Sequence, residues 1–525
     1  MKSDLSLDKL KSMWAILGLM IAALACARAD VAFSPNVSIT RNPTDSQGTS
    51  PPIQSPTSTA TSIGFGSATA TPSRPTPVAS PTFPPTPTLS SSSPLENVLY
   101  ESQPGDIVHT LAIRFGVLPS DIRPASGVLP PEGGLLDPGT VLVIPDRLEN
   151  TGPEVHLIPD SEVVYSPHAA EFDVASFVAE QGGYLNSYGE LVNGIPRTGP
   201  EIVELVSLAH SINPRLLLAI LEYYSGWVTN PVSPFGEALN YPIGTIDILY
   251  QGLYRQLTWL SNELGQGYYG WRSGTLLDLV LFDGTTVRLA PALNAGTVAL
   301  QYVFSLRESF AGWIESSDPE GFVSTYKALF GDPGEYFHPL YEPDLEQPPM
   351  TLPFMPGRFW SFTGGPHGAW EKEAAWAALD FAPPSSEPGC VPSEEWVVAA
   401  SPGLVVRSTN GLVVVDLDGD GLEQTGWVIM YLHVGTTNRV APGTFMEQGD
   451  LIGHPSCEGG FATGTHVHVA RKYNGEWILA DGPLAFDLSG WVAQAGTLPY
   501  QGALNKGDQT VLACTCSSEE TLISR

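Results

Sequence analysis

Two histidines separated by one residue, directly after a glycine-rich turn, constrain the fold of this chain most strongly. They are His466 and His468, and the turn before them reads Cys457-Glu-Gly-Gly-Phe-Ala-Thr-Gly-Thr465. On a β-strand, side chains at i and i+2 point to the same face, about 6.6 Å apart along the strand. Glycines before such a strand let the backbone approach a ligand closely. The pattern therefore predicts a β-strand that presents two imidazoles to one site.

Further metal-binding side chains lie upstream in the same β-rich segment. Asp380 stands in Ala-Leu-Asp-Phe, His433 in Tyr-Leu-His and His367 in Gly-Gly-Pro-His. Catalytic zinc sites usually combine three protein ligands with a fourth position that is open to water. The set therefore predicts a zinc site with additional imidazoles beside the metal.

The charge of the chain narrows its partners. Lys and Arg number 24 and Asp and Glu 55, which gives a formal net charge of −31. No basic segment is concentrated enough to hold phosphates, so we expect no nucleic-acid binding. Anionic membrane surfaces would be repelled as well, so membrane attachment requires a covalent lipid or a spanning segment.

Residues 1–29 predict an export signal. Three lysines precede an apolar run over residues 13–25, which is short for a membrane span and typical of a signal-peptide core. Cleavage before Cys26 would leave that cysteine to carry a lipid, whereas Ala27-Arg-Ala29 suits ordinary signal peptidase, and an uncleaved anchor is the third alternative. Each predicts an exported protein, either a cell-surface lipoprotein or a secreted, wall-associated one. Residues 30–95 are dominated by Ser, Thr and Pro and predict an unfolded stalk.

The cysteines suggest one disulfide. If Cys26 is lipidated, four cysteines remain, an even number in an exported chain. Cys390 and Cys457 lie in the same predicted domain and are candidates for a disulfide. Cys514 and Cys516 stand too close in the chain for an unstrained bond with each other.

Residues 96–147 resemble a LysM module. The matching segments are Gln103-Pro-Gly-Asp106, Arg114-Phe-Gly116 and Gly139-Thr-Val-Leu-Val-Ile-Pro145. The resemblance implies a βααβ fold that binds glycans containing N-acetylglucosamine. The stretch between the last two segments is rich in proline, which puts the second helix in doubt. A small α+β spacer domain without sugar affinity is the alternative.

Residues 165–340 predict a mostly helical domain. The segment Ile212–Gly226 resembles the helix of lysozyme-like lytic transglycosylases, in which a catalytic Glu directly precedes the Ser of this motif. Here that position is Tyr224, which cannot protonate a glycosidic oxygen at neutral pH. Glu222 lies about 200° away around the helix. We therefore expect a non-catalytic spacer or glycan-binding domain.

Residues 350–501 resemble the lysostaphin/LytM-type zinc endopeptidases, which cut peptidoglycan cross-bridges. The shared elements are Asp380, Tyr431-x-His433 and Gly464-x-His466-x-His468. Most members place a His four residues before the Asp, where this chain has Trp376. The staphylolysin-like branch uses a longer separation, and His367 stands 13 residues before Asp380. That branch also carries the Cys-Glu-Gly-Gly sequence found at 457–460.

The resemblance implies a role for each residue of the set. His367, Asp380 and His468 would bind zinc, with water as the fourth ligand, and His433 and His466 would act as acid and base. The expected enzyme is a zinc-dependent peptidoglycan endopeptidase, and oligoglycine, other glycine-containing cross-bridges and the stem peptide all remain open as substrates. The alternative is a catalytically degenerate protein that binds peptidoglycan or activates other wall hydrolases.

The whole chain is thus expected to be multidomain and monomeric. A small α+β LysM-like module precedes a mostly α middle domain, and an all-β peptidase domain of antiparallel sheets follows. Residues 502–525 are expected to form a flexible tail.

Overall fold

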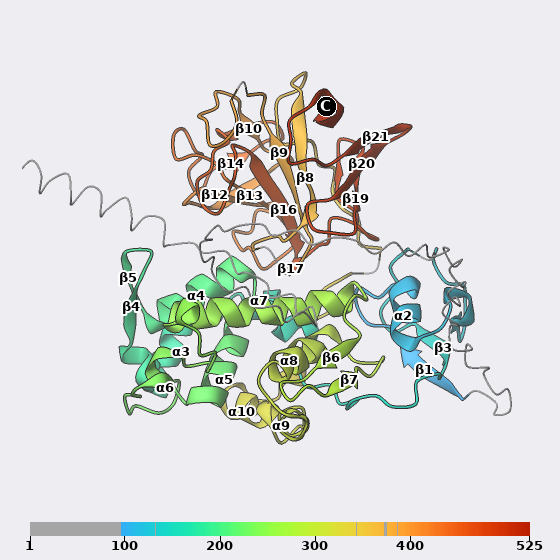
Figure 1. The fold of residues 1–525 in the computed structure, drawn as a ribbon, viewed down its shortest axis with the longest axis vertical. Helices are drawn as coiled ribbons and strands as arrows, with labels where there is room; N and C mark the ends of the chain where they lie inside the picture. The colour runs from blue at the N-terminus through green and yellow to red at the C-terminus, as the bar shows by residue number, and fades with distance from the viewer. Residues whose placement is uncertain (1–95, 132, 343, 372–374, 386) are drawn as a thin grey trace, which may run out of the picture. The chain divides into compact units, whose positions relative to one another are not determined.

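The computed structural model of the protein describes residues 96–525, except 132, 343, 372–374 and 386 (Figure 1). The predicted export signal, Cys26 and the predicted stalk lie outside the described residues. Within the described part of the chain, no helix combines the length and the apolar character that crossing a membrane requires.

The first region is a three-stranded sheet with one helix against it. Strands β1 (Asn97–Glu101) and β3 (Val141–Pro145) pair antiparallel, and β2 (Arg123–Pro124) pairs with the other side of β3. Helix α2 (Val108–Phe115) ends at Gly116, whose φ of 64° is a left-handed conformation that glycine adopts without strain. The doubtful second helix is a single 3-10 turn at Pro119–Asp121. The strand–helix–strand frame is therefore present, and LysM identity stays a prediction.

The middle region is mostly helical, as the sequence predicts. Polar caps and prolines start its helices: Thr198 and Glu201 form a capping box before α4, and Asn213 caps α5 with Pro214 at its first position. Two short hairpins interrupt the helices, β4 (Gly189–Val192) with β5 (Ile195–Thr198) and β6 (Asp278–Val280) with β7 (Thr286–Arg288). The helices are α3 (Val174–Gln181), α4 (Gly199–His210), α5 (Pro214–Ser225), α6 (Glu237–Asn240), α7 (Leu253–Arg272), α8 (Ala295–Ser305), α9 (Phe310–Ser316) and α10 (Phe322–Phe330).

The C-terminal region contains one large sheet whose pairings are antiparallel, as the resemblance implies. Its strand order is β14-β11-β12-β13-β16-β9-β8-β22, with β17 paired to β16. The central strands are apolar on both faces because other parts of the chain cover them; all six residues of β13 are buried. The strands are β8 (Trp360–His367), β9 (Ala378–Ala382), β11 (Gly403–Thr409), β12 (Leu412–Asp416), β13 (Trp427–Leu432), β14 (Phe445–Met446), β16 (Val467–Tyr473), β17 (Glu476–Trp477) and β22 (Leu522–Ile523).

Two smaller sheets accompany the large one. Strand β10 (Val397–Val398) pairs with β15 (Leu451–Gly453). A four-stranded sheet has the order β18-β19-β20-β21. Its strands are β18 (Asp487–Leu488), β19 (Trp491–Ala495), β20 (Gly502–Lys506) and β21 (Gln509–Leu512).

The prediction of a flexible tail over residues 502–525 is wrong. Strands β20 and β21 form a hairpin, and β22 pairs with β8 at the edge of the large sheet. Leu504 and Ile523 are buried, with at most 1% of their surface exposed. The apolar runs are too short to stand out in the sequence, and only the neighbouring sheet surfaces make their burial favourable.

The sequence places Cys514 and Cys516 too close in the chain for an unstrained bond with each other. The structure joins them by a disulfide, with Cα atoms 5.0 Å apart. A bend at Thr515–Cys516 shortens the Cα separation below that of an extended strand, into the range that disulfides span.

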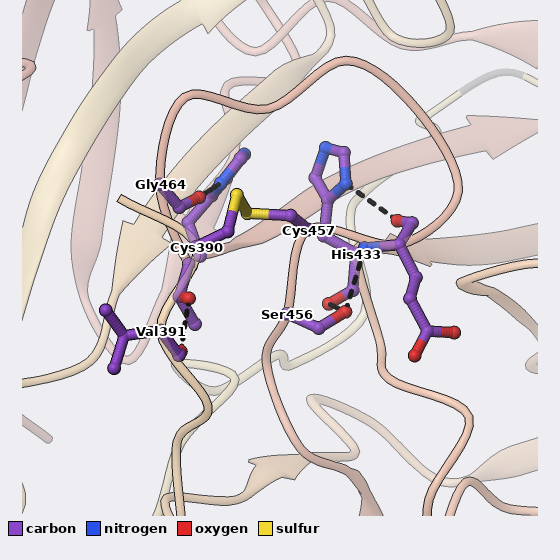
Figure 2. Close-up of a disulfide and its surroundings, with 9 residues drawn as sticks. Cys390, Val391, His433, Ser456, Cys457 and Gly464 are labelled. Carbon is purple, nitrogen blue, oxygen red and sulfur yellow. Dashed lines mark hydrogen bonds between the residues drawn. A yellow bond between two sulfur atoms is a disulfide. The ribbon is translucent and has the colours of Figure 1, made fainter. Parts of the chain in front are cut away.

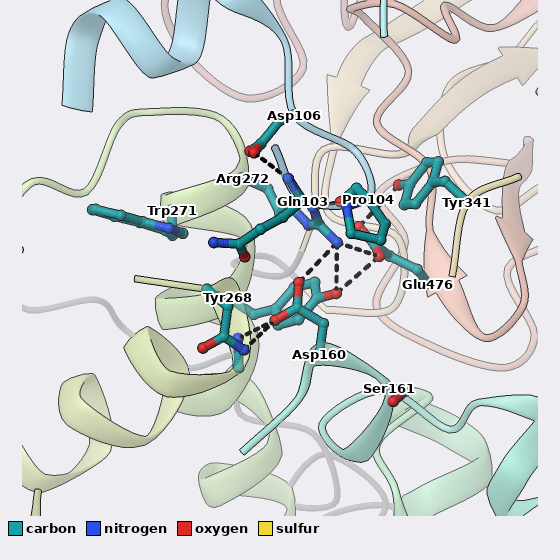
Figure 3. Close-up of polar contacts among 12 residues, drawn as sticks. Gln103, Pro104, Asp106, Asp160, Ser161, Tyr268, Trp271, Arg272, Tyr341 and Glu476 are labelled. Carbon is teal, nitrogen blue, oxygen red and sulfur yellow. Dashed lines mark hydrogen bonds and ion pairs between the residues drawn. The ribbon is translucent and has the colours of Figure 1, made fainter. Parts of the chain in front are cut away.

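The helical and β-rich regions share one hydrophobic core rather than packing as separate modules. Figure 1 shows α7 lying beside β17. Tyr268 at the end of α7 donates a hydrogen bond of 2.8 Å from its hydroxyl to Glu476 Oε2 in β17. Arg272 makes ion pairs of 3.1 Å with both Glu476 and Asp160, and it also donates to the carbonyl oxygen of Pro104 in the first region (Figure 3). One buried guanidinium therefore ties three regions together.

Candidate metal centre

Three neighbouring strands bring the predicted ligands together. Strand β16 lies between β13 and β9, and its register sets His468 directly opposite Asp380. His367 is the last residue of β8, which pairs with β9 on the other side. A Cβ at position 364 would lie 2.9 Å from the Cβ of Asp380, so Gly364 leaves the room that this carboxylate occupies. The antiparallel sheet thus joins residues that are about 100 positions apart in the chain.

The three side chains form a compact set of ligand atoms. His367 Nε2 lies 3.0 Å from His468 Nδ1 and 3.3 Å from Asp380 Oδ1, and His468 Nδ1 lies 3.1 Å from the same oxygen. The residues are 2%, 6% and 7% exposed for His367, His468 and Asp380, so water screens them little.

Backbone carbonyls determine which nitrogen of each imidazole is free. His367 Nδ1 lies 2.8 Å from the carbonyl oxygen of Gly365, and His468 Nε2 lies 2.8 Å from that of Ala369. A carbonyl oxygen only accepts, so these nitrogens carry the protons and donate. In the neutral form of each ring, the other nitrogens, His367 Nε2 and His468 Nδ1, therefore direct lone pairs at each other and at Asp380 Oδ1.

Three converging lone pairs repel one another unless a cation lies between them. Two imidazole nitrogens and one carboxylate oxygen form a donor set that zinc prefers, and hydrogen bonds from the far ring nitrogen to the backbone are the usual support for such ligands. The residues present therefore fit a zinc ion.

The carboxylate of the cluster is held in its ionised form. Burial raises the pKa of Asp380. When the imidazoles carry protons on the nitrogens that face it, the charges of His367 and His466 and the hydrogen bonds from His367 and His468 outweigh burial and hold that pKa well below its usual range. Burial lowers the pKa of His468, although its hydrogen bond to Asp380 acts in the opposite direction. A lowered pKa favours the carboxylate of Asp380 and the neutral imidazole of His468, which are the forms that bind a metal.

Two more imidazoles lie beside the cluster. His466 Nε2 is 3.8 Å from Asp380 Oδ1, and the rings of His433 and His466 are 4.4 Å apart. His433 Nδ1 donates to the carbonyl oxygen of Glu458 at 2.9 Å, and His466 Nδ1 donates to that of Gly464 at 2.8 Å. In the neutral form of each ring, Nε2 is therefore the unprotonated nitrogen. Burial lowers the pKa of His433 to about 3, with His466 and His468 adding to the shift, so His433 is a neutral proton acceptor.

His433 lies just beyond the end of a β-strand, so the alternation of side chains along that strand does not set the direction of its ring. Strand β13 ends at Leu432, and His433 follows it with a φ of 65°. A left-handed conformation is uncommon for a residue with a side chain, and such conformations cluster at functional sites. The backbone turn, rather than the face of β13, directs this ring towards His466.

A disulfide holds the loop that orients both rings. Cys390 and Cys457 are bonded, and the segment after Cys457 supplies the carbonyl groups of Glu458 and Gly464 (Figure 2). Ser456 adds two hydrogen bonds to the carbonyl oxygen of His433, one from its backbone N–H at 2.7 Å and one from its hydroxyl at 3.0 Å.

Tyr500 belongs to the site although no motif in the sequence points to it. Tyr500 stacks on the ring of His367 with centroids 4.1 Å apart and an interplanar angle of 22°. It lies in the connection between β19 and β20, and its carbonyl oxygen accepts a hydrogen bond from Gly365 N at 2.9 Å. Tyr500 is 37% exposed, so it borders both a predicted ligand and solvent.

The helical region does not place a glycosidase acid at the position of the resemblance. Glu222 accepts hydrogen bonds from the backbone N–H groups of Val228 and Thr229, at 2.9 and 3.1 Å. Its carboxylate therefore stabilises the turn after α5. Tyr224 packs beneath Arg307, whose guanidinium carbon is 4.1 Å from the ring centroid.

Comparison with known proteins yields two kinds of likeness. A family model described as LasA, N-terminal domain, matches residues 156–344, the helical middle region. Protease LasA of Pseudomonas aeruginosa, strains UCBPP-PA14 and PAO1, is 26% identical over 355 residues, which is 62% of this chain and 75% of the relative.

Solved structures also match the chain, with low TM-scores. The deep-sea M23 metalloprotease pseudoalterin is 22% identical with a TM-score of 0.27, covering 33% of this chain and 96% of that one. The catalytic domain of lysostaphin from Staphylococcus simulans is 20% identical with a TM-score of 0.17, covering 24% and 89%. The likeness in sequence to Protease LasA extends over three quarters of the length of that relative.

Proposed function

We propose that this chain is an exported zinc endopeptidase that hydrolyses peptide bonds of peptidoglycan, in cross-bridges or stem peptides. The observation that carries the proposal is the set of three buried lone pairs on His367, Asp380 and His468, fixed by backbone carbonyls. This arrangement is unfavourable without a cation and matches the ligand preference of zinc.

The mechanism follows from the residues around the cluster. When bound, zinc would supply a Lewis acid and lower the pKa of a coordinated water towards ~7. His433 and His466 offer unprotonated Nε2 atoms beside Asp380, and either is able to accept the proton of the attacking water. The same imidazole then donates that proton to the leaving amine, which completes the hydrolysis.

We also propose how the remaining regions serve this enzyme. Residues 96–147 would bind N-acetylglucosamine-containing glycan, and a lipid on Cys26 would tether the protein at the cell surface. Holding a weak glycan binder and a hydrolase in one chain raises the concentration of substrate at the catalytic site.

The test is to measure zinc content and hydrolysis of purified peptidoglycan for the full chain and three variants. We expect one zinc per chain in the wild type and in His454→Ala. His454 is a control because it stacks on Trp396 at 4.0 Å and donates to Glu395 O, rather than facing the cluster. His468→Ala and His367→Ala should lose both zinc and hydrolysis.

Two results would contradict the proposal. A folded wild-type protein without zinc would show that the cluster does not bind this metal. Zinc without hydrolysis of any peptidoglycan, accompanied by wall binding that survives His468→Ala, would favour the degenerate binder or activator.

A further inference from the structure

A second cavity lies in the helical region, at the C-terminal end of α5. It encloses about 510 Å³, within the range typical of small-molecule sites. Tyr223, Tyr224 and Tyr241 give it aromatic walls, and Arg307 is the basic residue in its lining. The proposed peptidase chemistry uses none of these residues.

Arg307 has one guanidinium nitrogen that the fold leaves without a hydrogen-bond partner among the described residues. Its guanidinium stacks over the ring of Tyr224 at 4.1 Å. Its Nη1 atom is buried and has no hydrogen-bond partner among the described residues. A Cβ at position 244 would clash with Nη2, so Gly244 keeps open the space that the guanidinium occupies. A buried donor without a partner is costly, and a bound acceptor would remove that cost.

The carboxylates near Arg307 influence which hydrogen-bond acceptor a bound ligand would present to it. Glu237 lines the cavity at an exposed position, and Glu308 follows Arg307 in the chain. Glu308 Oε1 accepts from the hydroxyl of Tyr224 at 3.5 Å. Burial raises the pKa of Glu308, and the charge of Arg307 acts in the opposite direction. Two carboxylates near one guanidinium disfavour a dianion such as phosphate. A monoanionic carboxylate pairs with the planar guanidinium through two parallel hydrogen bonds.

We propose that this cavity binds a carboxylate-bearing sugar, with the carboxylate on Arg307 and the sugar ring against the tyrosines. Tyrosine rings offer flat apolar surfaces, and their hydroxyl groups reach the polar groups of a sugar. Ser225 and Gly226 at the end of α5 line the same cavity. The inference goes beyond the peptidase and does not depend on zinc.

The test compares two amino sugars that differ in one substituent. N-acetylmuramic acid carries a carboxylate on a lactyl ether, and N-acetylglucosamine lacks that group. With the full chain in a calorimeter, we expect N-acetylmuramic acid to bind roughly 10-fold to 100-fold more tightly, as charged hydrogen bonds allow. Arg307→Gln should remove this preference, and Arg307→Lys, which keeps the charge without the planar fork, should retain part of it.

Arg255→Gln is the matched control. Arg255 lines a separate cavity of about 580 Å³ in the same region, together with Tyr184 and Tyr188. Its substitution should leave the preference unchanged. Equal affinity for both sugars in the wild type, or a preference that survives Arg307→Gln, would overturn the proposal. The proposal would also be overturned if Arg255→Gln removed the preference for N-acetylmuramic acid while Arg307→Lys and Arg307→Gln kept it. The ligand would then lie in the cavity that Arg255 lines. Either sugar could also bind to residues 96–147. Only the difference in affinity that depends on Arg307 is therefore assigned to this cavity.

Discussion

At the scale of single residues, hydrogen bonds to carbonyl oxygens decide what each imidazole can do. His367 is protonated on Nδ1 and His468 on Nε2, because Gly365 and Ala369 accept those protons. Opposite ring nitrogens of the two residues therefore face the same point. The spacing of histidines in a sequence suggests a metal site, but it does not contain this information about the free nitrogen.

Substitution of Tyr500 would measure how much its stacked ring helps to position His367, a proposed zinc ligand. We expect Tyr500→Ala to weaken zinc binding about 10-fold to 100-fold, the range typical of residues that support metal ligands, because His367 loses the ring against which it packs. Tyr500→Phe keeps the ring and should bind zinc as the wild type does. Competition with a chromophoric chelator measures both affinities. Equal affinity in all three proteins would show that the stacking has no positioning role.

At the scale of elements, one disulfide-bonded loop serves the two proposed acid/base histidines and not the proposed ligands. The carbonyl groups that orient His433 and His466 belong to Glu458 and Gly464, which follow Cys457. Those that orient the ligands belong to the segment around β8. Loss of the disulfide in this loop should therefore lower catalysis while metal binding is retained.

The Cys390→Ser/Cys457→Ser variant provides that separation. We expect it to keep its zinc while kcat falls, and to lose about 2–4 kcal/mol of stability, as is usual when a native disulfide is removed. Cys514→Ser/Cys516→Ser is the control, because that bond closes a loop of two residues and lies outside the site. Zinc content, kcat and thermal unfolding are measured side by side. A parallel loss of zinc and activity would contradict the separate support of the two groups.

At the scale of the whole molecule, the described regions meet at Arg272. Its guanidinium pairs with Asp160 and Glu476, and the rings of Tyr268 and Tyr341 lie 5.4 and 5.5 Å from it (Figure 3). Glu476 is in β17, which pairs with the strand that carries His468. The junction thus connects the helical region to the sheet that holds the site.

Removal of this guanidinium should destabilise the chain strongly. Arg272→Met would leave the buried carboxylate of Glu476 and the partly buried carboxylate of Asp160 without their cationic partner, and we expect a loss of about 3–5 kcal/mol in the free energy of unfolding. Arg147→Met removes an exposed pair with Asp121 and should cost less than about 1 kcal/mol. Denaturant unfolding of the full chain measures both. Similar small losses would mean that the junction contributes little to cohesion.

The sequence by itself was sufficient for the mostly helical middle region, for the antiparallel sheets of the C-terminal region and for the residues that the candidate site brings together. Periodicity and capping residues predicted the helical middle region, and short β-branched runs predicted the antiparallel strands, because both signals are local. The Gly-x-His-x-His pattern and the His at position 367 identified the side chains that the structure brings together. Local patterns carry this information since they reflect backbone preferences and the chemistry of individual side chains.

The tertiary structure alone decided the remaining features, because they depend on residues distant in the chain. Tyr500 contacts His367 across more than 130 residues, and the last strand becomes a strand only where the edge of β8 accepts it. The free nitrogen of each ligand depends on where a carbonyl oxygen lies in space. The unpartnered Nη1 of Arg307 is likewise visible only once the surrounding chain has enclosed it.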